Sequence, residues 1–317
     1  MPSSRDRSML VQAATLYYLE GCSQAEVAQA IGVTRSNVSR VLSEARRLGI
    51  VEIRVHGDAY RNDELERQIE DRFGIGEVIV VQPLMDSPAL PVVGRIGAEW
   101  LLEHVPTNGS IAVSWGSGVQ ALVESVTTAN RHPEVEVLPL VGGLSGVEST
   151  RDANVLVREL ANRLGAAHRR LYAPAIVESK ESRDALLREP AIRGVLDDAK
   201  RADLAVVGIG AVGSGASSEI IRAMNLNESE RQAFEQSQAV GDCCTRYFND
   251  SGNAIDGVVN NRVIAVELED LRQIPTVMGV ACGRAKAPGV RALLRGEILD
   301  ALFIDAELAE SLLSLEA

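Results

Sequence analysis

The sequence has few cysteines and no long apolar run. Its cysteines show neither the paired spacing of metal ligands nor the density of a disulfide framework, so we expect reduced thiols, no metal and no cofactor. No apolar stretch approaches the roughly 20 residues that span a bilayer. The start, MPSSRDRSML, lacks the apolar core of a signal peptide. These absences argue against a membrane partner and predict a cytoplasmic protein.

The length and the charge distribution indicate two different domains. A chain of 317 residues that is 46% hydrophobic and 24% charged is expected to form two globular domains more readily than one. The net charge of −12 argues at first against nucleic acid as a partner. However, residues 1–57 hold seven arginines, no lysine and five acidic residues, a balance of +2, which leaves −14 for the remainder. A mildly basic head and an acidic body therefore predict separate tasks.

Residues 1–57 carry the pattern of a helix-turn-helix. Apolar residues recur at helical spacing over 11–19, and a glycine follows as a stop signal. Ser23 and Glu26 form a capping box that opens a short second helix. Ala28 is the small residue that a close helix crossing needs, and Gly32 supplies the turn. A third helix over 35–48 follows.

The third helix is expected to expose polar side chains suited to DNA. Its apolar stripe of Val38, Val41, Leu42 and Ala45 leaves a run of Arg, Ser and Asn facing outward. Such side chains bind base edges and phosphate oxygens. The predicted DNA-binding residues are Thr34, which can also cap the helix, Arg35, Ser36, Asn37, Ser39, Arg40, Arg46 and Arg54. A purely structural three-helix lobe would explain the stripe but not the exposed polar run, so double-stranded operator DNA is the expected partner.

A small wing and a linker helix are expected after the third helix. Residues 50–55 alternate as a half-buried strand. Residues 58–75 are highly charged, with Leu65, Ile69 and Phe73 at i, i+4 and i+8. This stripe is compatible with simple packing or with an oligomer seam. Its place between a DNA head and a body favours a seam, because operators are usually read as two half-sites. A homo-oligomer, either dimer or tetramer, is expected.

Residues 76–317 alternate between strand-like and helical patterns, which predicts an α/β body with a mainly parallel sheet covered on both faces. The expected strands are 78–81, 110–115, 135–141, 171–173, 204–209, 276–281 and 301–304. The expected helices are 92–104, 119–126, 153–164, 192–200, 228–236, 290–294 and 306–313.

Three of the expected strands run into glycine-rich turns, WGSG at 115–118, VGGLSG at 141–146 and GIGAVGSG at 208–215. In open α/β sheets, ligands bind at the carboxyl ends of strands, where glycine lets backbone N–H groups surround an anion. Each turn alone is more typical of a tight connection. A dinucleotide site at 208–213 is discounted, because no acidic residue follows at the end of a second strand about 20 residues on.

Nearly the whole chain resembles the SorC family of sugar-binding bacterial transcription regulators. The segments that carry the resemblance are VTRSNVSRVLSEARRLGIVEIRV (33–55), SWGSGVQALV (114–123), PLVGG (139–143), DANVLVRELANRLGA (152–166), YAPA (172–175), VVGIG (206–210), GDCCTRYFNDSG (241–252) and GVACGRAKAPGVRALLRGEILDALFID (279–305). The resemblance implies a winged helix-turn-helix head and a body similar in fold to sugar-phosphate isomerases and CoA transferases, without their catalysis. It also implies a tetramer whose operator affinity changes on binding a sugar phosphate or related metabolite.

The resemblance also implies an effector site. A phosphate cradle would consist of Gly116, Ser117 and Gly118 with Lys286, while Asn154 and Asp250 would lie near sugar hydroxyls. The full predicted effector set is Gly116, Ser117, Gly118, Gly143, Asp152, Asn154, Gly210, Asp250 and Lys286. Gly118 stands where family members commonly have Thr, and Asp152 where a Gln often precedes the Ala-Asn pair. A carboxylate at 152 would repel a phosphate. The effector can therefore also be a less charged sugar, a polyol or a phosphate bound in a different orientation.

Two other classes of function are weighed against a regulator of a carbohydrate operon. The first is a sugar-phosphate isomerase or deaminase with an accessory DNA-binding head. Such chemistry needs a positioned general base, and the four histidines show no recognisable pairing, although acids such as Asp242 and Glu219 could serve. The second is a regulator whose body only oligomerises. The sequence favours neither, and no enzymatic activity is expected.

Overall fold

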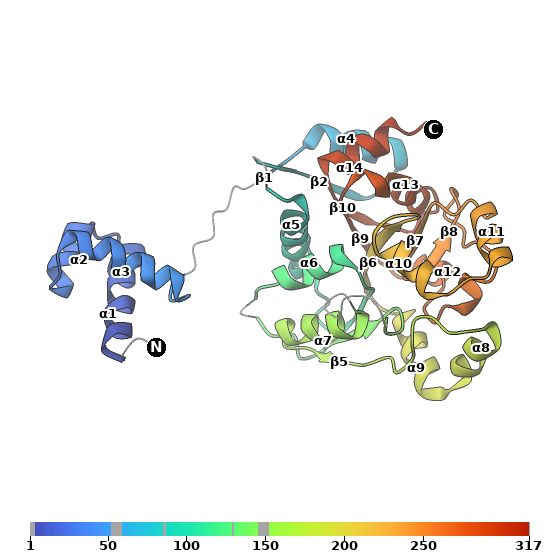
Figure 1. Ribbon diagram of the computed structural model, residues 1–317, viewed down its shortest axis with the longest axis horizontal. Coiled ribbons are helices and arrows are strands. Elements are labelled where there is room, and N and C mark those ends of the chain that lie inside the picture. Colours follow the sequence, from blue (N-terminus) through green and yellow to red (C-terminus); the bar gives the residue numbers. More distant parts are fainter. Residues whose placement is uncertain (1–3, 52–58, 85–86, 129, 145–151, 317) are drawn as a thin grey trace. The chain divides into compact units, whose positions relative to one another are not determined.

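The computed structural model describes residues 4–51, 59–84, 87–128, 130–144 and 152–316, and no placement is given for the remainder. The chain forms two compact units, Met1–Gly57 and Asp58–Ala317 (Figure 1), which we call the head and the body. Among the described residues, no helix is long and apolar enough to cross a membrane. None of their His, Cys, Asp and Glu side chains form a group able to hold a metal ion.

The head consists of helices packed around a small apolar core. Their bounds are α1 Ser4–Ala14, η1 Thr15–Leu19, α2 Gln24–Ile31 and α3 Arg35–Arg47. The core contains Ala13, Val27, Ala28, Val38 and Leu42. The first helix begins earlier than its apolar pattern indicated, and its last turn, η1, is a π-helix. The predicted wing lies mostly outside the described residues, and within them Ile50 and Val51 form bends that pack beside Ala45.

The body is built on one mostly parallel sheet with the strand order β1-β2-β10-β9-β6-β3-β4-β5. From β2 to β5 every neighbouring pair is parallel, while β1 is antiparallel to β2, and the β7–β8 hairpin is antiparallel to β6. The strands are β1 Ala59–Arg61, β2 Glu77–Pro83, β3 Gly109–Val113, β4 Val135–Pro139, β5 Ala167–His168, β6 Leu204–Ala211, β7 Gly241–Cys243, β8 Arg246–Phe248, β9 Val277–Ala281 and β10 Ala301–Asp305. The expected α/β class with a mainly parallel sheet is confirmed.

Helices cover both faces of this sheet (Figure 1). Alternate residues of each central strand point to opposite faces: Ile79 and Val81 enter the core beneath α5–α7, whereas Val78 and Val80 enter the core on the other face. The helices of the body are α4 Asp63–Phe73, α5 Ala89–His104, α6 Ser117–Ser125, α7 Ala153–Leu164, α8 Lys180–Arg188, α9 Pro190–Ala199, α10 Gly215–Ala223, α11 Glu228–Gln236, η3 Asn260–Arg262, α12 Leu268–Leu271, η4 Arg284–Lys286, α13 Ala287–Arg295 and α14 Ala306–Ser314.

The apolar stripe of α4 packs onto the body. Ile69 is fully buried in the core of the body, and Leu65 and Phe73 are partly buried against it. Arg72 ties the end of α4 to the C-terminal helix region by donating to the carbonyl oxygens of Leu313 (2.7 Å) and Leu315 (2.6 Å). Packing on the body therefore accounts for this stripe, and the oligomer seam expected along it stays a prediction.

Candidate functional site

Local hydrogen bonds fix both the start of α2 and the turn between α2 and α3, where the Gly32 and Val33 amides donate to the Ala28 carbonyl. The Ser23 hydroxyl accepts from the Glu26 amide and the Glu26 carboxylate accepts from the Ser23 amide, so the predicted capping box is confirmed. Gly32 ends α2 with a φ of +71°, a conformation that glycine adopts without a Cβ clash. Val27 of α2 and Val38 of α3 are fully buried in the same cluster. These contacts hold α3 across α2 in a helix-turn-helix arrangement.

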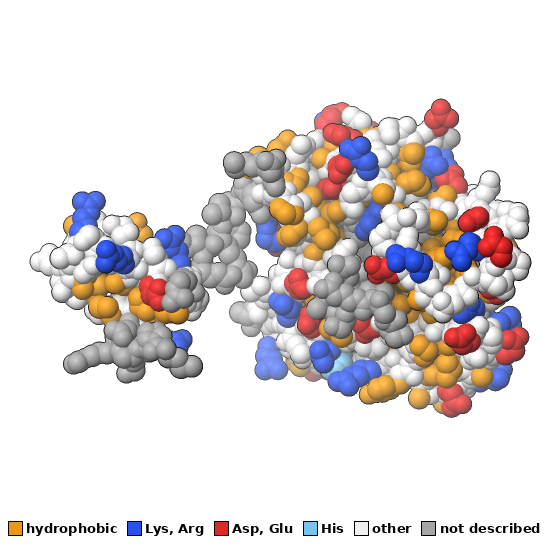
Figure 2. All heavy atoms as spheres, viewed as in Figure 1, with side chains coloured by type: hydrophobic (Ala, Val, Ile, Leu, Met, Phe, Trp, Pro, Cys, Tyr) orange, Lys and Arg blue, Asp and Glu red, His pale blue; other side chains and the backbone are white. Residues whose placement is uncertain are grey.

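The first turns of α3 present polar side chains to solvent. The exposed residues are Thr34, Arg35, Ser36, Asn37, Ser39, Arg40 and, further along, Arg46. Thr34 occupies the N-cap position, but its hydroxyl contacts the Ser36 hydroxyl (3.0 Å) and does not accept from a backbone amide. Arg54 lies outside the described residues. Figure 2 shows one face of the head, on which arginine side chains (blue) are spread with few acidic side chains (red) among them. A face of this kind suits a polyanionic partner.

A pocket of about 170 Å³ lies at the carboxyl ends of the neighbouring strands β3 and β6, and we call it the Lys286 pocket. The structure brings together here a subset of the predicted effector residues, namely Gly116, Ser117, Gly118, Gly210 and Lys286. The other lining residues are Trp115, Gly208, Ile209, Ala211, Ser214, Gly215, Ala216, Ser217 and Asp242. The pocket thus occupies the position where ligands bind in open α/β sheets.

Lys286 supplies a cationic group to this pocket from the end of η4, just before α13. Burial lowers the pKa of its ammonium group by removing water, while Cys282, Asp242 and Asp305 raise it through their negative charge. Within the described part of the chain, no acceptor lies within hydrogen-bond or ion-pair distance of the ammonium. A desolvated cation without a protein partner favours an anionic or strongly polar ligand group.

Asp242 of β7 lies at the buried side of the pocket and is 3% exposed. Burial raises the pKa of its carboxyl group to about 6, although the Ser217 hydroxyl, the positive charge of Lys286 and a backbone hydrogen bond from Thr245 lower it. The Ser217 hydroxyl donates to the carboxylate. The Tyr247 hydroxyl in turn donates to the Ser217 carbonyl (2.8 Å), which fixes the first turn of α10. This carboxyl group can accept a hydrogen bond from a ligand hydroxyl.

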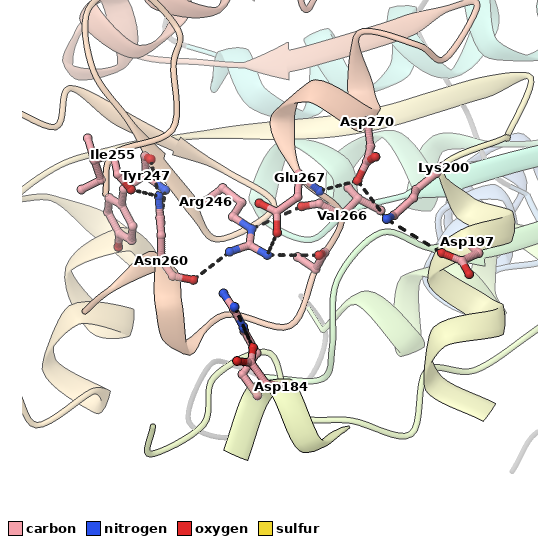
Figure 3. A network of polar contacts seen from close by, with 12 residues as sticks. Asp184, Asp197, Lys200, Arg246, Tyr247, Ile255, Asn260, Val266, Glu267 and Asp270 are labelled. Atoms are coloured by element: carbon pink, nitrogen blue, oxygen red, sulfur yellow. Dashed lines mark hydrogen bonds and ion pairs between the residues drawn. The ribbon is translucent and has the colours of Figure 1, made fainter. Parts of the chain in front are cut away.

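The β7–β8 hairpin that carries Asp242 is anchored by a buried arginine (Figure 3). Arg246 is 2% exposed, and its guanidinium donates to the carbonyl oxygens of Val266 (3.3 Å), Asn260 (2.7 Å) and Ala265 (3.2 Å) and to the carboxylate of Glu267 (2.7 Å). All three guanidinium nitrogens therefore have partners, as a buried cation requires. The network holds the hairpin, and hence Asp242, against the end of β6.

Two glycines allow the close packing of this site. A Cβ atom at Gly118 would lie 2.5 Å from the carbonyl oxygen of Val280 in β9, so the threonine common in the SorC family would need β9 to shift. A Cβ atom at Gly210 would collide with the side chains of Asp242 and Ser217. The Asp242 carboxyl group can approach β6 only because position 210 lacks a side chain.

The structure places Gly143, Asp152 and Asn154 away from the Lys286 pocket. Gly143 lines a separate hollow. The Asp152 carboxylate caps α7 and also accepts from the Leu144 amide (2.7 Å). The Asn154 side-chain amide donates to the Leu171 carbonyl (3.3 Å) and accepts from the Leu171 amide (2.9 Å). The polar atoms of both side chains are therefore engaged in holding the backbone, and the Asp152 charge does not line the cradle.

Asp250 is likewise outside the Lys286 pocket. Its carboxylate forms ion pairs with Arg291 (2.6 Å) and with Arg295, both on α13. Arg291 also donates to the carbonyl oxygen of Glu316 (2.8 Å). Asp250 therefore fastens the turn after β8 to α13, and its expected place beside a sugar hydroxyl stays a prediction.

Sequence reasoning did not assign Asp242, Ser217 or Trp115 to the effector site. Trp115 is 6% exposed, lines the pocket and donates from its indole nitrogen to the Thr245 hydroxyl (3.1 Å). Asp242 was considered only as an acid for a possible enzyme. The available signal was a lone carboxylate in the apolar stretch AVGDCC, because an acid that must be buried usually serves a site or a network.

A helix-turn-helix head joined to an α/β body, whose pocket lies at the carboxyl ends of parallel strands, defines the class of transcriptional regulators. A family model described as "Putative sugar-binding domain" matches residues 58–314. The chain therefore belongs to this family, the sugar-binding transcriptional regulators of the SorC type, and is not an enzyme.

Curated relatives match over nearly the full length of the chain. The sorbitol operon regulator of Klebsiella pneumoniae is 29% identical over 99% of this chain and 100% of its own length. The deoxyribonucleoside regulator of Bacillus subtilis is 29% identical over 98% and 99%. Both are named as regulators, which excludes the isomerase or deaminase alternative considered above.

Solved structures agree with this assignment. The full-length sorbitol operon regulator SorC from Klebsiella pneumoniae has a TM-score of 0.80 at 29% identity, and the match covers 98% of this chain and 100% of that one. A DeoR family transcriptional regulator from Listeria monocytogenes has a TM-score of 0.71 at 27% identity over 79% and 98%. The match to the full-length regulator includes the head as well as the body.

Proposed function

We propose that this regulator binds double-stranded operator DNA through α3 and that a small carbohydrate with an anionic group, bound in the Lys286 pocket, changes its operator affinity. The observation that carries the effector site is Lys286, which lines the same pocket as the Gly116–Gly118 turn and whose ammonium group has no partner among the described residues. The DNA site rests on the exposed first turns of α3.

The chemistry of the pocket favours a phosphorylated sugar or polyol as the effector. Lys286 contributes a point charge, and backbone N–H groups at the N-terminus of α6 with the Ser117 hydroxyl contribute donors for phosphate oxygens. Asp242 and Ser217 offer polar atoms for sugar hydroxyls. Because Asp152 is occupied in capping α7, its carboxylate no longer argues against a phosphate in this pocket.

The regulated genes are expected to form a carbohydrate catabolic operon. The names of two relatives, a sorbitol operon regulator and a deoxyribonucleoside regulator, support this assignment. We further propose that the protein acts in the cytoplasm as a homodimer or homotetramer, because a second copy of the head is needed to read two operator half-sites. In such an assembly one effector-dependent change in the body would act on both heads.

The effector proposal is tested by thermal unfolding of the full chain against a panel of sugars, polyols and their phosphate esters. A ligand at 100 times its dissociation constant stabilises the folded state by about 2.7 kcal/mol. We expect a phosphate ester to raise the melting temperature of the wild type more than that of Lys286→Ala at the same ligand concentration. Lys180→Ala, which alters a surface ion pair with Asp184 on α8, serves as the control. If no member of the panel shifts the wild type, the alternative of a body that only oligomerises is favoured.

A further inference from the structure

A second hollow, which we call the Arg262 hollow, lies in the body at the far end of α10. Its volume is about 390 Å³, within the range of about 300–1,000 Å³ that small-molecule sites occupy. The lining residues that matter here are Gly143, Ile176, Glu178, Ser182, Ala223 and Arg262. None of them lines the Lys286 pocket.

Arg262 is held rigidly at the wall of this hollow. The residue is 6% exposed and ends the short helix η3. Its guanidinium Nε donates to the Val177 carbonyl (2.7 Å), and its own carbonyl accepts from the Val177 amide (2.9 Å). The neighbouring Val263 forms an antiparallel bridge with Ile176. Arg262 is therefore bonded to Val177 through both its side chain and its main chain, and these bonds fix the orientation of the guanidinium plane.

The two terminal nitrogens of Arg262 have no partner in the described part of the chain. They carry four N–H donors, yet no acceptor lies within hydrogen-bond distance of them and no carboxylate within ion-pair distance. Arg246, which is 2% exposed, uses all its nitrogens to bind three carbonyl oxygens and a carboxylate (Figure 3). The terminal nitrogens of Arg262 are instead open to solvent in the hollow, since they are not among the buried unpartnered atoms of the described residues. They are therefore donors that an external acceptor can bind.

The polar groups beside Arg262 allow an anion to enter. Glu178 is the acidic residue of the lining, but its side chain is exposed and forms no ion pair with Arg262 in the described structure. The Ser182 hydroxyl, which is bonded to Ser179 (3.3 Å), stands at the same wall and can donate to a ligand. A planar guanidinium fork with two free edges matches the paired oxygens of a carboxylate or phosphate.

We propose that the Arg262 hollow is a second anion-binding site, which takes a carboxylate or phosphate group against the free guanidinium nitrogens of Arg262. Helix α10 connects the two sites, with Ser217 at the Lys286 pocket and Ala223 at the Arg262 hollow. Six residues at 1.5 Å rise place them about 9 Å apart along the helix axis. The anion is either a separate small ion or the far end of a carbohydrate held by Lys286, and the latter source rests on the proposed function.

The test is isothermal titration calorimetry on the full chain with inorganic phosphate and with 6-phosphogluconate, an open-chain sugar acid that carries an anionic group at each end. The variants are Arg262→Gln, Arg262→Lys and Lys286→Ala, with Arg188→Gln, an exposed arginine on α8, as the matched control. Arg262→Lys keeps the positive charge but loses the fork, so it reports on binding even where Arg262→Gln unfolds. Melting temperatures of the free variants identify such unfolding.

The proposal predicts that phosphate binding weakens at least tenfold in Arg262→Gln and several-fold in Arg262→Lys, and is unchanged in Arg188→Gln. If the binding of 6-phosphogluconate weakens at least tenfold in both Arg262→Gln and Lys286→Ala, one ligand spans both sites. If it depends on Arg262 but not on Lys286, the anion is separate, and the proposed role of Lys286 fails while the Arg262 site stands. If both Arg262 variants bind both probes as tightly as the wild type does, the proposed Arg262 site is overturned, whatever the result for Lys286→Ala.

Discussion

At the residue scale, the body contains ionisable groups whose burial is explained by a ligand site. Lys286 and Asp242 line the same pocket, and burial moves the pKa of each toward its neutral form. The two groups are linked only through their charges, since no ion pair joins them within the described structure. A bound polar ligand can supply both groups with the hydrogen-bond partners that burial removes.

Asp242 gives a pH-dependent prediction at this scale. Its carboxyl group has a pKa near 3.8 when exposed and about 6 in the folded protein. Between these values the folded state holds a proton that the unfolded state has lost, so rising pH destabilises the fold through this group. Asp242→Asn removes the effect. We expect the free energy of unfolding of Asp242→Asn, relative to wild type, to rise by about 2 kcal/mol from pH 4 to pH 7.

The measurement is urea unfolding of both proteins without ligand at several pH values. A constant difference between Asp242→Asn and wild type across this range would show that the carboxyl group titrates as it does in water. Other carboxyl groups contribute equally to both proteins, so they cancel in the difference.

Arg40 and Arg46 are predicted to differ in their effect on DNA recognition. Both side chains are exposed on α3, but Arg40 lies in its first two turns and Arg46 near its end. The start of a recognition helix faces base edges, whereas its end lies near the backbone. Arg40→Ala should cost about 1–3 kcal/mol on the operator and relax sequence preference. Arg46→Ala should weaken all sequences alike.

Fluorescence anisotropy with operator and random duplexes at one fixed salt concentration measures both effects, since affinity for DNA depends strongly on salt. Arg188→Ala in the body provides a control for the loss of one positive charge. Equal losses on both duplexes for Arg40→Ala would contradict a role in base recognition.

At the scale of elements, α4 belongs to the body and gives a stability prediction. Ile69 is fully buried, whereas Gln68, the adjacent residue, is exposed. Ile69→Lys places an unpaired charge in the core and should lower the free energy of unfolding by about 3 kcal/mol or more. Gln68→Lys should change it by less than about 0.5 kcal/mol. Chemical unfolding of both variants checks this, and an Ile69→Lys variant that is as stable as wild type but loses a subunit contact would contradict the packing role and support a seam.

Periodicity predicted the central elements of the body well. The helices expected at 153–164 and 228–236 have those bounds in α7 and α11, because an apolar stripe or a capping residue marks their ends. The long parallel strands were found as apolar runs. The residues 171–173, expected as a strand, are in fact a loop beside the two-residue strand β5, because apolar composition does not reveal whether a neighbouring strand is available.

The elements that complete the site were not predictable in the same way. The strands β7 and β8 are three residues long, and their buried Asp242 and Arg246 break the expected apolar pattern. Their burial depends on partners such as Asn260 and Glu267, which are far away in the sequence. Local patterns therefore identified the glycine turns, and the family resemblance added Lys286, but neither pointed to Asp242. The resemblance also implied ligand roles for Asn154 and Asp250, whose polar atoms form local hydrogen bonds and ion pairs in the structure.

At the scale of the whole molecule, the regulator consists of a head, for which we propose DNA binding through α3, and a body that holds the Lys286 pocket. The proposed function requires that the two communicate. A ligand shifts an equilibrium between two states only by its difference in affinity for them. Weakening the contacts in the Lys286 pocket should therefore reduce the response to effector without altering DNA contacts in the head. The same argument holds whether the effector strengthens or weakens operator binding.

The most direct test titrates the phosphate ester identified by thermal unfolding into operator-bound wild type, Lys286→Ala and Lys180→Ala, with operator affinity read by fluorescence anisotropy. We predict that Lys286→Ala binds the operator like wild type in the absence of effector but needs at least about tenfold more effector, a loss of about 1.4 kcal/mol, for the same response. Lys180→Ala should follow the wild-type curve. Overlapping curves for Lys286→Ala and wild type would contradict the central claim that this lysine holds the effector.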